Sequence, residues 1–307
     1  MIEFVEVSKD FRNFLPPRTT HALEGLTVTI ERGEVFGIAG PNGAGKTTML
    51  ALALGFLEPT RGTVRIDGER PRRHVEKAGV AYVSELVSIP NWWTVTGALM
   101  RYSVLAGVEQ RDRARMVHEA IERLGLEEHR SKRIKQLSKG NLQRLGITQA
   151  LLSDSDLVVL DEPTHGLDPL WTQRFRDIVT DLRREDRAIM IASHNLDELE
   201  RLADRVAILD RGSLSRIAGS AGSHHAVSGE ILRYRLVLAG EHESVEAMFP
   251  GAQRIDNARQ VAYDVSGDIE DLNARLARFL AEGGRVQAFF PAQSRLEVAF
   301  REAVGEE

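Results

Sequence analysis

A stretch of nine residues combines the residue types that bind a chain of phosphate groups. It fits the pattern Gly, four residues, Gly-Lys-Thr, and lies between an apolar run at 34–39 that predicts a strand and residues 49–54, which predict a helix. Glycines let successive N–H groups point at phosphate oxygens, and the helix N-terminus adds positive partial charge. The pattern favours a nucleotide site over a plain Gly-rich turn, formed by Gly40, Pro41, Asn42, Gly43, Ala44, Gly45, Lys46, Thr47 and Thr48.

Two carboxylates follow a second apolar run. Residues 157–160 predict a buried strand that ends in Asp161 and Glu162. In such a site Lys46 reaches the terminal phosphates, and Thr47 and Asp161 hold Mg²⁺ between them. Glu162 then polarises the water that attacks the γ-phosphate. The alternative is an acidic start to the next helix, since Pro163 follows, but the phosphate loop favours the catalytic interpretation.

Composition sets the broad class. The 307 residues are 42% hydrophobic and 28% charged, which is typical of a globular protein of one large domain or two. The net charge of -5 argues against a nucleic-acid partner, because counterion release requires a basic surface. The chain has no cysteine for disulfides or metal ligation. Residues 1–7 do not resemble a signal peptide, and no apolar run approaches the roughly 18 residues of a membrane span. Any span must come from another chain.

The order of the predicted elements indicates an α/β fold. Paired strands at 2–7 and 26–30 flank a polar insertion that contains Pro16-Pro17, Phe11 and Phe14. Further strands at 62–68, 79–84, 187–192 and 205–209 alternate with helices, which predicts a mostly parallel core sheet beside an antiparallel part. Apolar residues at helical spacing predict a helical insert at about 86–137, with its helices between 94 and 136.

The composition changes near residue 218. We expect a first domain over 1–218, a linker rich in Gly, Ser and Ala over 219–229, and a small α+β subdomain over 230–307. The subdomain is expected to contain three strands, at 232–238, 261–265 and 285–290, and helices near 269–280 and 296–303. His224-His225 in the linker is interpreted as a solvated pair rather than a metal site.

A third motif precedes the carboxylate strand. The run Leu137-Ser138-Lys139-Gly140-Asn141 resembles the Leu-Ser-Gly-Gly-Gln signature of ATP-binding cassette (ABC) ATPases, although by itself it could be an N-cap at Ser138. Its neighbours extend the resemblance over about residues 2–218. Residues 164–169, with Asp168, resemble the D-loop, Ser193-His194 resembles the switch histidine, and residues 80–85, ending in Glu85, occupy the place of the Q-loop.

The resemblance implies roles for these residues. Lys46, Glu162 and His194 would be catalytic, with Glu85 beside Thr47 and Asp161 at the metal. Ser138, Gly140 and Asn141 would serve the nucleotide of the opposite subunit, and the D-loop would cross the interface between subunits. The aromatic residue that stacks on adenine would be Phe11, with Phe14 as its rival and core packing as the alternative.

Four positions depart from the family pattern. Glu85 stands in place of Gln, Lys139 in place of Gly, Asn141 in place of Gln, and His165 in place of a smaller residue. Glu85 adds negative charge near the phosphates, whereas Lys139 adds a cation that is favourable beside the partner's γ-phosphate. None of the four replaces a main catalytic residue, so the sequence predicts a competent Mg²⁺-dependent ATPase.

The resemblance also implies partners and a location. We expect a second ABC ATPase subunit, either a copy or a close paralogue, and integral membrane permease subunits that hold the chain on the inner, cytoplasmic face of the membrane. Trp92-Trp93 is expected to contact the permease or to pack into the helical insert. Lys139 and the ending Leu296-Glu297-Val298-Ala299-Phe300 are similar to drug- and lipid-export subunits. Alternatives are an importer subunit or a soluble ABC ATPase of translation or repair.

Overall fold

The structure is a computed structural model that describes residues 2–14, 17–219, 232–240, 242, 245–257, 260–292 and 295–305. The chain divides into two compact units. One comprises Met1–Gly222 together with Ala299–Glu307, and the other comprises Ser223–Val298. Among the described residues, no helix has both the length and the apolar character needed to cross a membrane.

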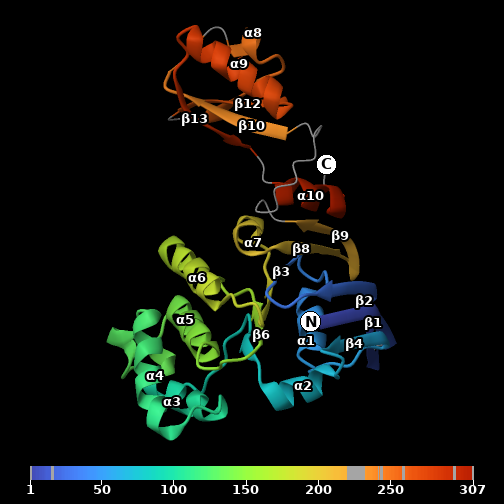
Figure 1. The fold of residues 1–307 in the computed structure, drawn as a ribbon, viewed down its shortest axis with the longest axis vertical. Helices are drawn as coiled ribbons and strands as arrows, with labels where there is room; N and C mark the ends of the chain where they lie inside the picture. The colour runs from blue at the N-terminus through green and yellow to red at the C-terminus, as the bar shows by residue number, and fades with distance from the viewer. Residues whose placement is uncertain are drawn as a thin grey trace. The chain divides into compact units, whose positions relative to one another are not determined.

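A six-stranded sheet lies at the centre of the first unit (Figure 1). The strand order is β5-β6-β7-β3-β8-β9, and all neighbours run parallel except the antiparallel pair β8 and β9. β3, β6 and β7 are buried along their whole length, as expected of parallel strands covered on both faces. The mostly parallel α/β core is confirmed. The bounds are β3 Val35–Ala39, β5 Ala81–Val83, β6 Leu157–Asp161, β7 Ala188–Ala192, β8 Arg205–Asp210 and β9 Ser213–Gly219.

A three-stranded antiparallel sheet of order β2-β1-β4 forms the rest of the β structure of this unit. Its strands are β1 (Ile2–Phe14), β2 (Pro17–Ile30) and β4 (Arg61–Ile66). The expectation of two short strands around a polar insertion was wrong, because β1 and β2 stay paired as far as Phe14 and Pro17. Residues 11, 12 and 19–21 of this extension are exposed, so backbone pairing maintains it without the alternating apolar pattern that identifies a half-buried strand.

Helices cover the core sheet and form the predicted insert. α1 contacts strands of both sheets, whereas α3 packs on α4 and α5, and α5 contacts β5 (Figure 1). Side-chain N-caps define several helix starts: Thr94 for α3, Ser138 for α5, Asp168 for α6 and Asn195 for α7. The helices are α1 Lys46–Ala53, α2 Pro71–Ala78, α3 Val95–Leu105, α4 Gln110–Arg123, α5 Lys139–Ala150, α6 Pro169–Leu182 and α7 Leu196–Leu202, with short 3₁₀ turns at Glu127–His129 and Ile134–Gln136.

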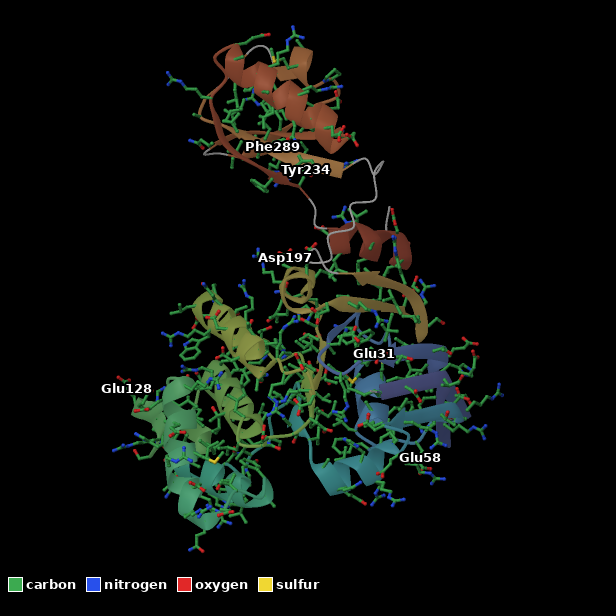
Figure 2. All side chains as sticks on the ribbon, viewed as in Figure 1. Glu31, Glu58, Glu128, Asp197, Tyr234 and Phe289 are labelled. Atoms are coloured by element: carbon green, nitrogen blue, oxygen red, sulfur yellow. The ribbon has the colours of Figure 1, made fainter. Side chains whose placement is uncertain are left out.

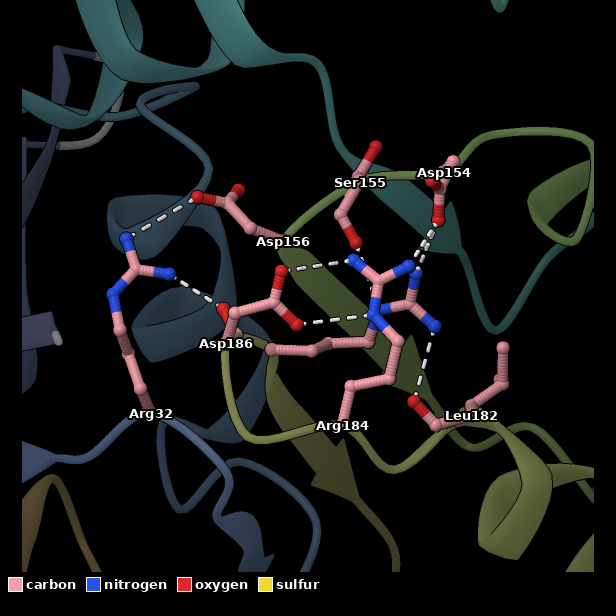
Figure 3. A network of polar contacts seen from close by, with 8 residues as sticks. Arg32, Asp154, Ser155, Asp156, Leu182, Arg184 and Asp186 are labelled. Carbon is pink, nitrogen blue, oxygen red and sulfur yellow. Dashed lines mark hydrogen bonds and ion pairs between the residues drawn. The ribbon is translucent and has the colours of Figure 1, made fainter.

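A polar network joins the loops that precede β6 and β7 (Figure 3). Asp154 Oδ1 lies 2.6 Å from Arg184 Nη1 and 2.8 Å from Nη2 of Arg187, whose side chain is buried. Arg187 also donates to the carbonyls of Ser155, at 2.8 Å, and Leu182, at 3.0 Å. These bonds satisfy a buried guanidinium and fix the amino ends of two strands whose carboxyl ends carry site residues.

The second unit contains an antiparallel sheet of order β11-β12-β10-β13. Its core includes Leu236, Phe249, Tyr263 and Phe279, and the rings of Tyr234 and Phe289 stack with centroids 5.0 Å apart (Figure 2). The expected α+β character is therefore present, with β11 as an additional strand. The elements are β10 Leu232–Leu238, α8 Val245–Met248, β11 Gln253–Asn257, β12 Gln260–Gly267, α9 Ile269–Ala281 and β13 Val286–Pro291.

The division of the C-terminal region differs from the expected boundary at 230–307. The last helix, α10, spans Arg295–Val304, and its residues from Ala299 onward belong to the first unit. There Glu302 lies 2.7 Å from Arg216 of β9, and the Ser215 hydroxyl donates to the carbonyl of Ala303 at 3.0 Å. Nearly all of the expected linker, including His224-His225, lies outside the described residues.

Candidate functional site

The phosphate loop connects β3 to α1, at the carboxyl edge of the parallel sheet. Gly45 adopts φ 104° at the N-cap of α1, and a Cβ at this position would lie only 2.5 Å from the carbonyl oxygen of Ala22. Any larger residue would therefore be strained and would clash with the backbone. The tight turn directs the N-terminus of α1, with its unpaired N–H groups, at the space above the loop.

Lys46 is the first residue of α1 and is largely buried. Its ammonium group donates to the carbonyls of Gly40, at 2.7 Å, and Pro41, at 3.3 Å, and lies 4.0 Å from Oε1 of Glu162. A buried cation beside the loop and a carboxylate can pair with phosphate oxygens. The structure thus brings together the loop and Glu162, as predicted from the sequence.

Asp161 ends β6 and is 2% exposed. Burial raises the pKa of its carboxyl group to about 6, and a hydrogen bond from Thr47 opposes this rise. Among the described residues, its Oδ1 atom is one of the few buried side-chain oxygens without a hydrogen-bond partner. A buried carboxylate oxygen that lacks a partner, beside the Thr47 hydroxyl, fits a hard divalent cation such as Mg²⁺.

Glu162 follows immediately, in a left-handed conformation with φ 47° that is uncommon outside glycine. Its N–H donates to the carbonyl of Ala192, at the end of β7, with an N···O distance of 2.9 Å. Its Oε2 atom lies 2.7 Å from Nδ1 of His194. This backbone geometry turns two adjacent carboxylates in different directions, so Asp161 contacts Thr47 while Glu162 contacts His194 and Lys46.

A cavity of about 750 Å³ contains these groups. The loop, both carboxylates and His194 line it, together with Glu85 from the segment after β5 and His165 from the turn before α6. Residues 20–22 of β2 supply its remaining wall. The lining residues are Thr20, His21, Ala22, Asn42, Gly43, Ala44, Gly45, Lys46, Thr47, Thr48, Glu85, Asp161, Glu162, His165 and His194.

The aromatic residue expected at this cavity is not among its lining residues. Phe11 is 40% exposed on β1, directly opposite Thr20 of β2, which does line the cavity. His21, which the sequence did not single out, lines the cavity and binds Asp10 at 2.7 Å. The side chain of Phe14 lies outside the described residues. His21 could have been found only from the pairing register of the two strands.

The signature residues do not line the cavity of their own chain. Ser138 Oγ accepts the N–H of Asn141 at the start of α5, and Gly140 lies so close to Gly166 that a Cβ would be 2.9 Å from its carbonyl oxygen. The Asn141 amide is bonded to Arg144 and to His129 within its own subunit. Asp168 likewise caps α6 by accepting the N–H of Trp171. Asp168, like the signature residues, is not among the residues that line the cavity of its own chain.

The phosphate loop, the carboxylate pair and the histidine define a phosphate-loop ATPase. A family model described as "ABC transporter" matches residues 23–165. An uncharacterized ABC transporter ATP-binding protein of Synechocystis, sll0415, is 32% identical over 306 residues, covering 96% of this chain and 85% of that protein. The ABC transporter ATP-binding protein NatA of Bacillus subtilis is 30% identical, covering 76% of this chain and 96% of NatA. The chain belongs to the ATP-binding proteins of ABC transporters.

Solved structures agree on the fold. The ATP-binding cassette MJ0796, solved as a dimer in a post-hydrolysis state with ADP and Pi, has a TM-score of 0.65 at 22% identity, covering 71% of this chain and 98% of that one. A structure described as the ATP-binding subunit of an ABC transporter has a TM-score of 0.62 at 27% identity, covering 71% of this chain and 90% of that one. The family match and the relatives above, together with this fold, identify the chain as an ATP-binding subunit that hydrolyses ATP.

Proposed function

We propose that this chain powers an ABC exporter by closing, with ATP bound, against a second ATP-binding subunit beneath a membrane-embedded permease. The observation that carries the hydrolytic part is the contact of Glu162 with both His194 and Lys46 at the cavity. Glu162 polarises the attacking water, Lys46 stabilises charge on the phosphates, and His194 orients Glu162. Bound Mg²⁺, held by Thr47, Asp161 and Glu85, would supply further neutralisation of the phosphates.

The need for a second subunit rests on the position of the signature. Ser138 and Gly140 lie outside the cavity of their own chain, yet the N-terminus of α5 is a potential binding site for a phosphate group. A second chain that presents the same segment would complete each cavity. Closure then follows from the greater affinity of ATP for the closed pair than for the separate subunits.

The permease contact is supported by exposed apolar side chains near the cavity segment that holds Glu85. Leu86 is 77% exposed and Trp92 is 73% exposed, so two large apolar side chains of this segment are accessible to a partner. Trp93 instead packs edge-to-face on Tyr102 of α3, with ring centroids 6.5 Å apart, beneath Arg101. Of the two tryptophans, Trp92 is therefore the interface candidate and Trp93 the packing residue. Because ATP is cytoplasmic, we place this surface at the inner face of the membrane.

The direction of transport rests on the residues that depart from the family pattern. Lys139 in the signature and Glu85 at the Q-loop position are the features that favour export. Sequence identity to relatives does not separate import from export. The methionine import ATP-binding protein MetN of Thermobifida fusca is 34% identical to the chain, and so is the bacitracin transport ATP-binding protein BcrA of Bacillus licheniformis.

The test is co-purification. A tagged Glu162→Gln chain, extracted from detergent-solubilised membranes with ATP and Mg²⁺, is expected to retain a stoichiometric multi-spanning protein identified by mass spectrometry. Trp92→Ala in the same background is expected to lose that partner, whereas Leu280→Ala, at an exposed position of α9, serves as the matched control. Recovery of a substrate-binding protein with the permease would indicate import. Ribosomal or DNA-repair partners without a membrane protein would overturn the transport assignment.

A further inference from the structure

Three of the four departures from the family pattern form one contiguous group. Nε2 of His165 lies 3.0 Å from Nζ of Lys139, and Nδ1 of the same ring lies 4.0 Å from Oε1 of Glu85. The aliphatic part of Lys139 also passes over Gly166, where a Cβ would lie 3.2 Å from Lys139 Cδ. His165 therefore bridges two charged residues that come from separate segments of the chain.

The chemistry of the two neighbours determines which nitrogen of the neutral His165 ring carries the proton. A lysine ammonium group can only donate hydrogen bonds, so Nε2 of His165 must accept in the contact with Lys139. The ring proton of the neutral imidazole is then on Nδ1, and it faces Glu85, whose carboxylate can only accept. One imidazole ring therefore lies between a carboxylate and a cation, with one nitrogen toward each.

The two ends of this group lie in different functional segments of the chain, the nucleotide cavity and the signature segment. Glu85 and His165 line the nucleotide cavity of their own chain, whereas Lys139 is the first residue of α5 and does not. The His165 ring also lies edge-to-face with that of His194, with centroids 6.3 Å apart, and His194 binds Glu162. His165 thus lies against His194, which we assign to the γ-phosphate side of the cavity, and against Lys139 of the signature segment.

We propose that His165 is a positioning residue that couples nucleotide and metal at its own cavity to the placement of Lys139 against the second nucleotide. The inference rests on the proposed closure of two subunits. A ligand that binds Glu85 alters the contact between Glu85 and His165. The His165 ring then shifts, and Lys139, which is bonded to the ring, shifts with it. In the single chain the His165–Glu85 pair is about half exposed, so solvent screens it. Closure removes water and strengthens the same contacts.

A double-mutant cycle tests the coupling. In the Glu162→Gln background, Glu85→Gln and Lys139→Ala are made singly and together, and the ATP concentration that half-saturates dimer formation is measured by sedimentation. With His165 present, the combined effect is expected to depart from the product of the single effects by about fivefold or more. In His165→Ala, the departure is expected to fall below twofold. His165→Gln, whose amide can still accept from Lys139, is expected to recover part of it.

Each outcome decides a separate point. Multiplicative effects of Glu85→Gln and Lys139→Ala in the presence of His165, or a coupling that persists in His165→Ala, would overturn the inference while the dimer stands. Absence of any ATP-dependent dimer would overturn the proposed function and the inference with it. His118→Ala, an exposed histidine on α4, is the matched control. Should a His165→Ala chain fail to fold, His165→Leu, which can neither accept from Lys139 nor donate to Glu85, takes its place, and the departure is again expected to fall below twofold.

Discussion

Nδ1 of His194 lies 2.7 Å from Oε2 of Glu162, and the other carboxylate oxygen of Glu162 lies 4.0 Å from Nζ of Lys46. The glutamate is therefore held from two sides, by His194 just after β7 and by Lys46 at the start of α1, while its own backbone directly follows β6. A carboxylate that is oriented in this way, and largely buried, is suited to accept a proton from water at the γ-phosphate.

Replacement of that carboxylate is expected to stop turnover while binding survives. Glu162→Gln keeps the shape of the side chain but cannot accept the proton, so kcat is expected to fall by about 10²- to 10⁴-fold. Phosphate-release assays measure the loss, and fluorescent-nucleotide titration is expected to show ATP affinity within about threefold of wild type. Lys46→Ala is the contrasting variant, because it is expected to lose ATP binding itself. A Glu162→Gln chain with wild-type turnover would remove Glu162 from the catalytic role.

His194 is expected to act through Glu162. His194→Ala leaves the carboxylate in place but removes its partner at 2.7 Å, so kcat is expected to fall by about 10²-fold with little change in KM for ATP. The matched control is His118→Ala, an exposed histidine on α4, which is expected to leave kcat unchanged. A rise in KM at constant kcat would instead assign His194 to nucleotide binding.

Asp161 predicts a pH-dependent stability of the ligand-free chain. Its pKa is raised from an ordinary value of 3.8 to about 6, so the folded state holds a proton that the unfolded state has lost between these values. The neutral carboxyl group is therefore favoured in the folded state, and this stabilisation is complete below pH 4. It is lost as the pH rises through 6. In denaturant titrations, the free energy of unfolding of Asp161→Asn is expected to exceed that of wild type by roughly 3 kcal/mol at pH 8 and to equal it near pH 4.

Thermal unfolding with ATP and Mg²⁺ tests whether Asp161 holds the metal ion. Addition of ATP with Mg²⁺ at pH 8 is expected to raise the midpoint of thermal unfolding for wild type, since a ligand of the folded state alone stabilises it. The increase over ATP with EDTA is expected to be much smaller for Asp161→Asn. An equal increase in both chains would show that Asp161 does not hold the metal.

The adjacent tryptophans are expected to behave differently. Trp93→Ala removes a partly buried ring that packs on Tyr102 of α3. Denaturant titration is therefore expected to show a loss of about 1–3 kcal/mol in the free energy of unfolding. Trp92→Ala alters an exposed ring, and a change within about 0.5 kcal/mol is expected. Trp92→Ala is instead expected to reduce recovery of the chain with membranes. Reversed effects would place Trp92 in the core.

That the phosphate loop and the two carboxylates meet at one cavity was largely predictable, because each of these motifs is local. The strand, loop and helix around Lys46, and the strand that ends in Asp161 and Glu162, carry their own signals in a few consecutive residues. The paired extension that contains Phe11 and His21 was not predictable, because exposed strands lack alternating apolar residues. The side-chain contacts of His165 and Asn141 also required the structure, since their partners come from segments that the sequence does not relate.

The proposed closure of two subunits is decided by the mass of the Glu162→Gln chain in analytical ultracentrifugation, with and without ATP and Mg²⁺. A monomer is expected in the absence of nucleotide and a dimer in its presence, because each cavity lacks the signature segment that a second chain would supply. Ser138→Arg, which places a bulky side chain at the start of α5, is expected to prevent the dimer without loss of ATP binding. A Glu162→Gln chain that binds ATP and remains monomeric at all concentrations would contradict the account.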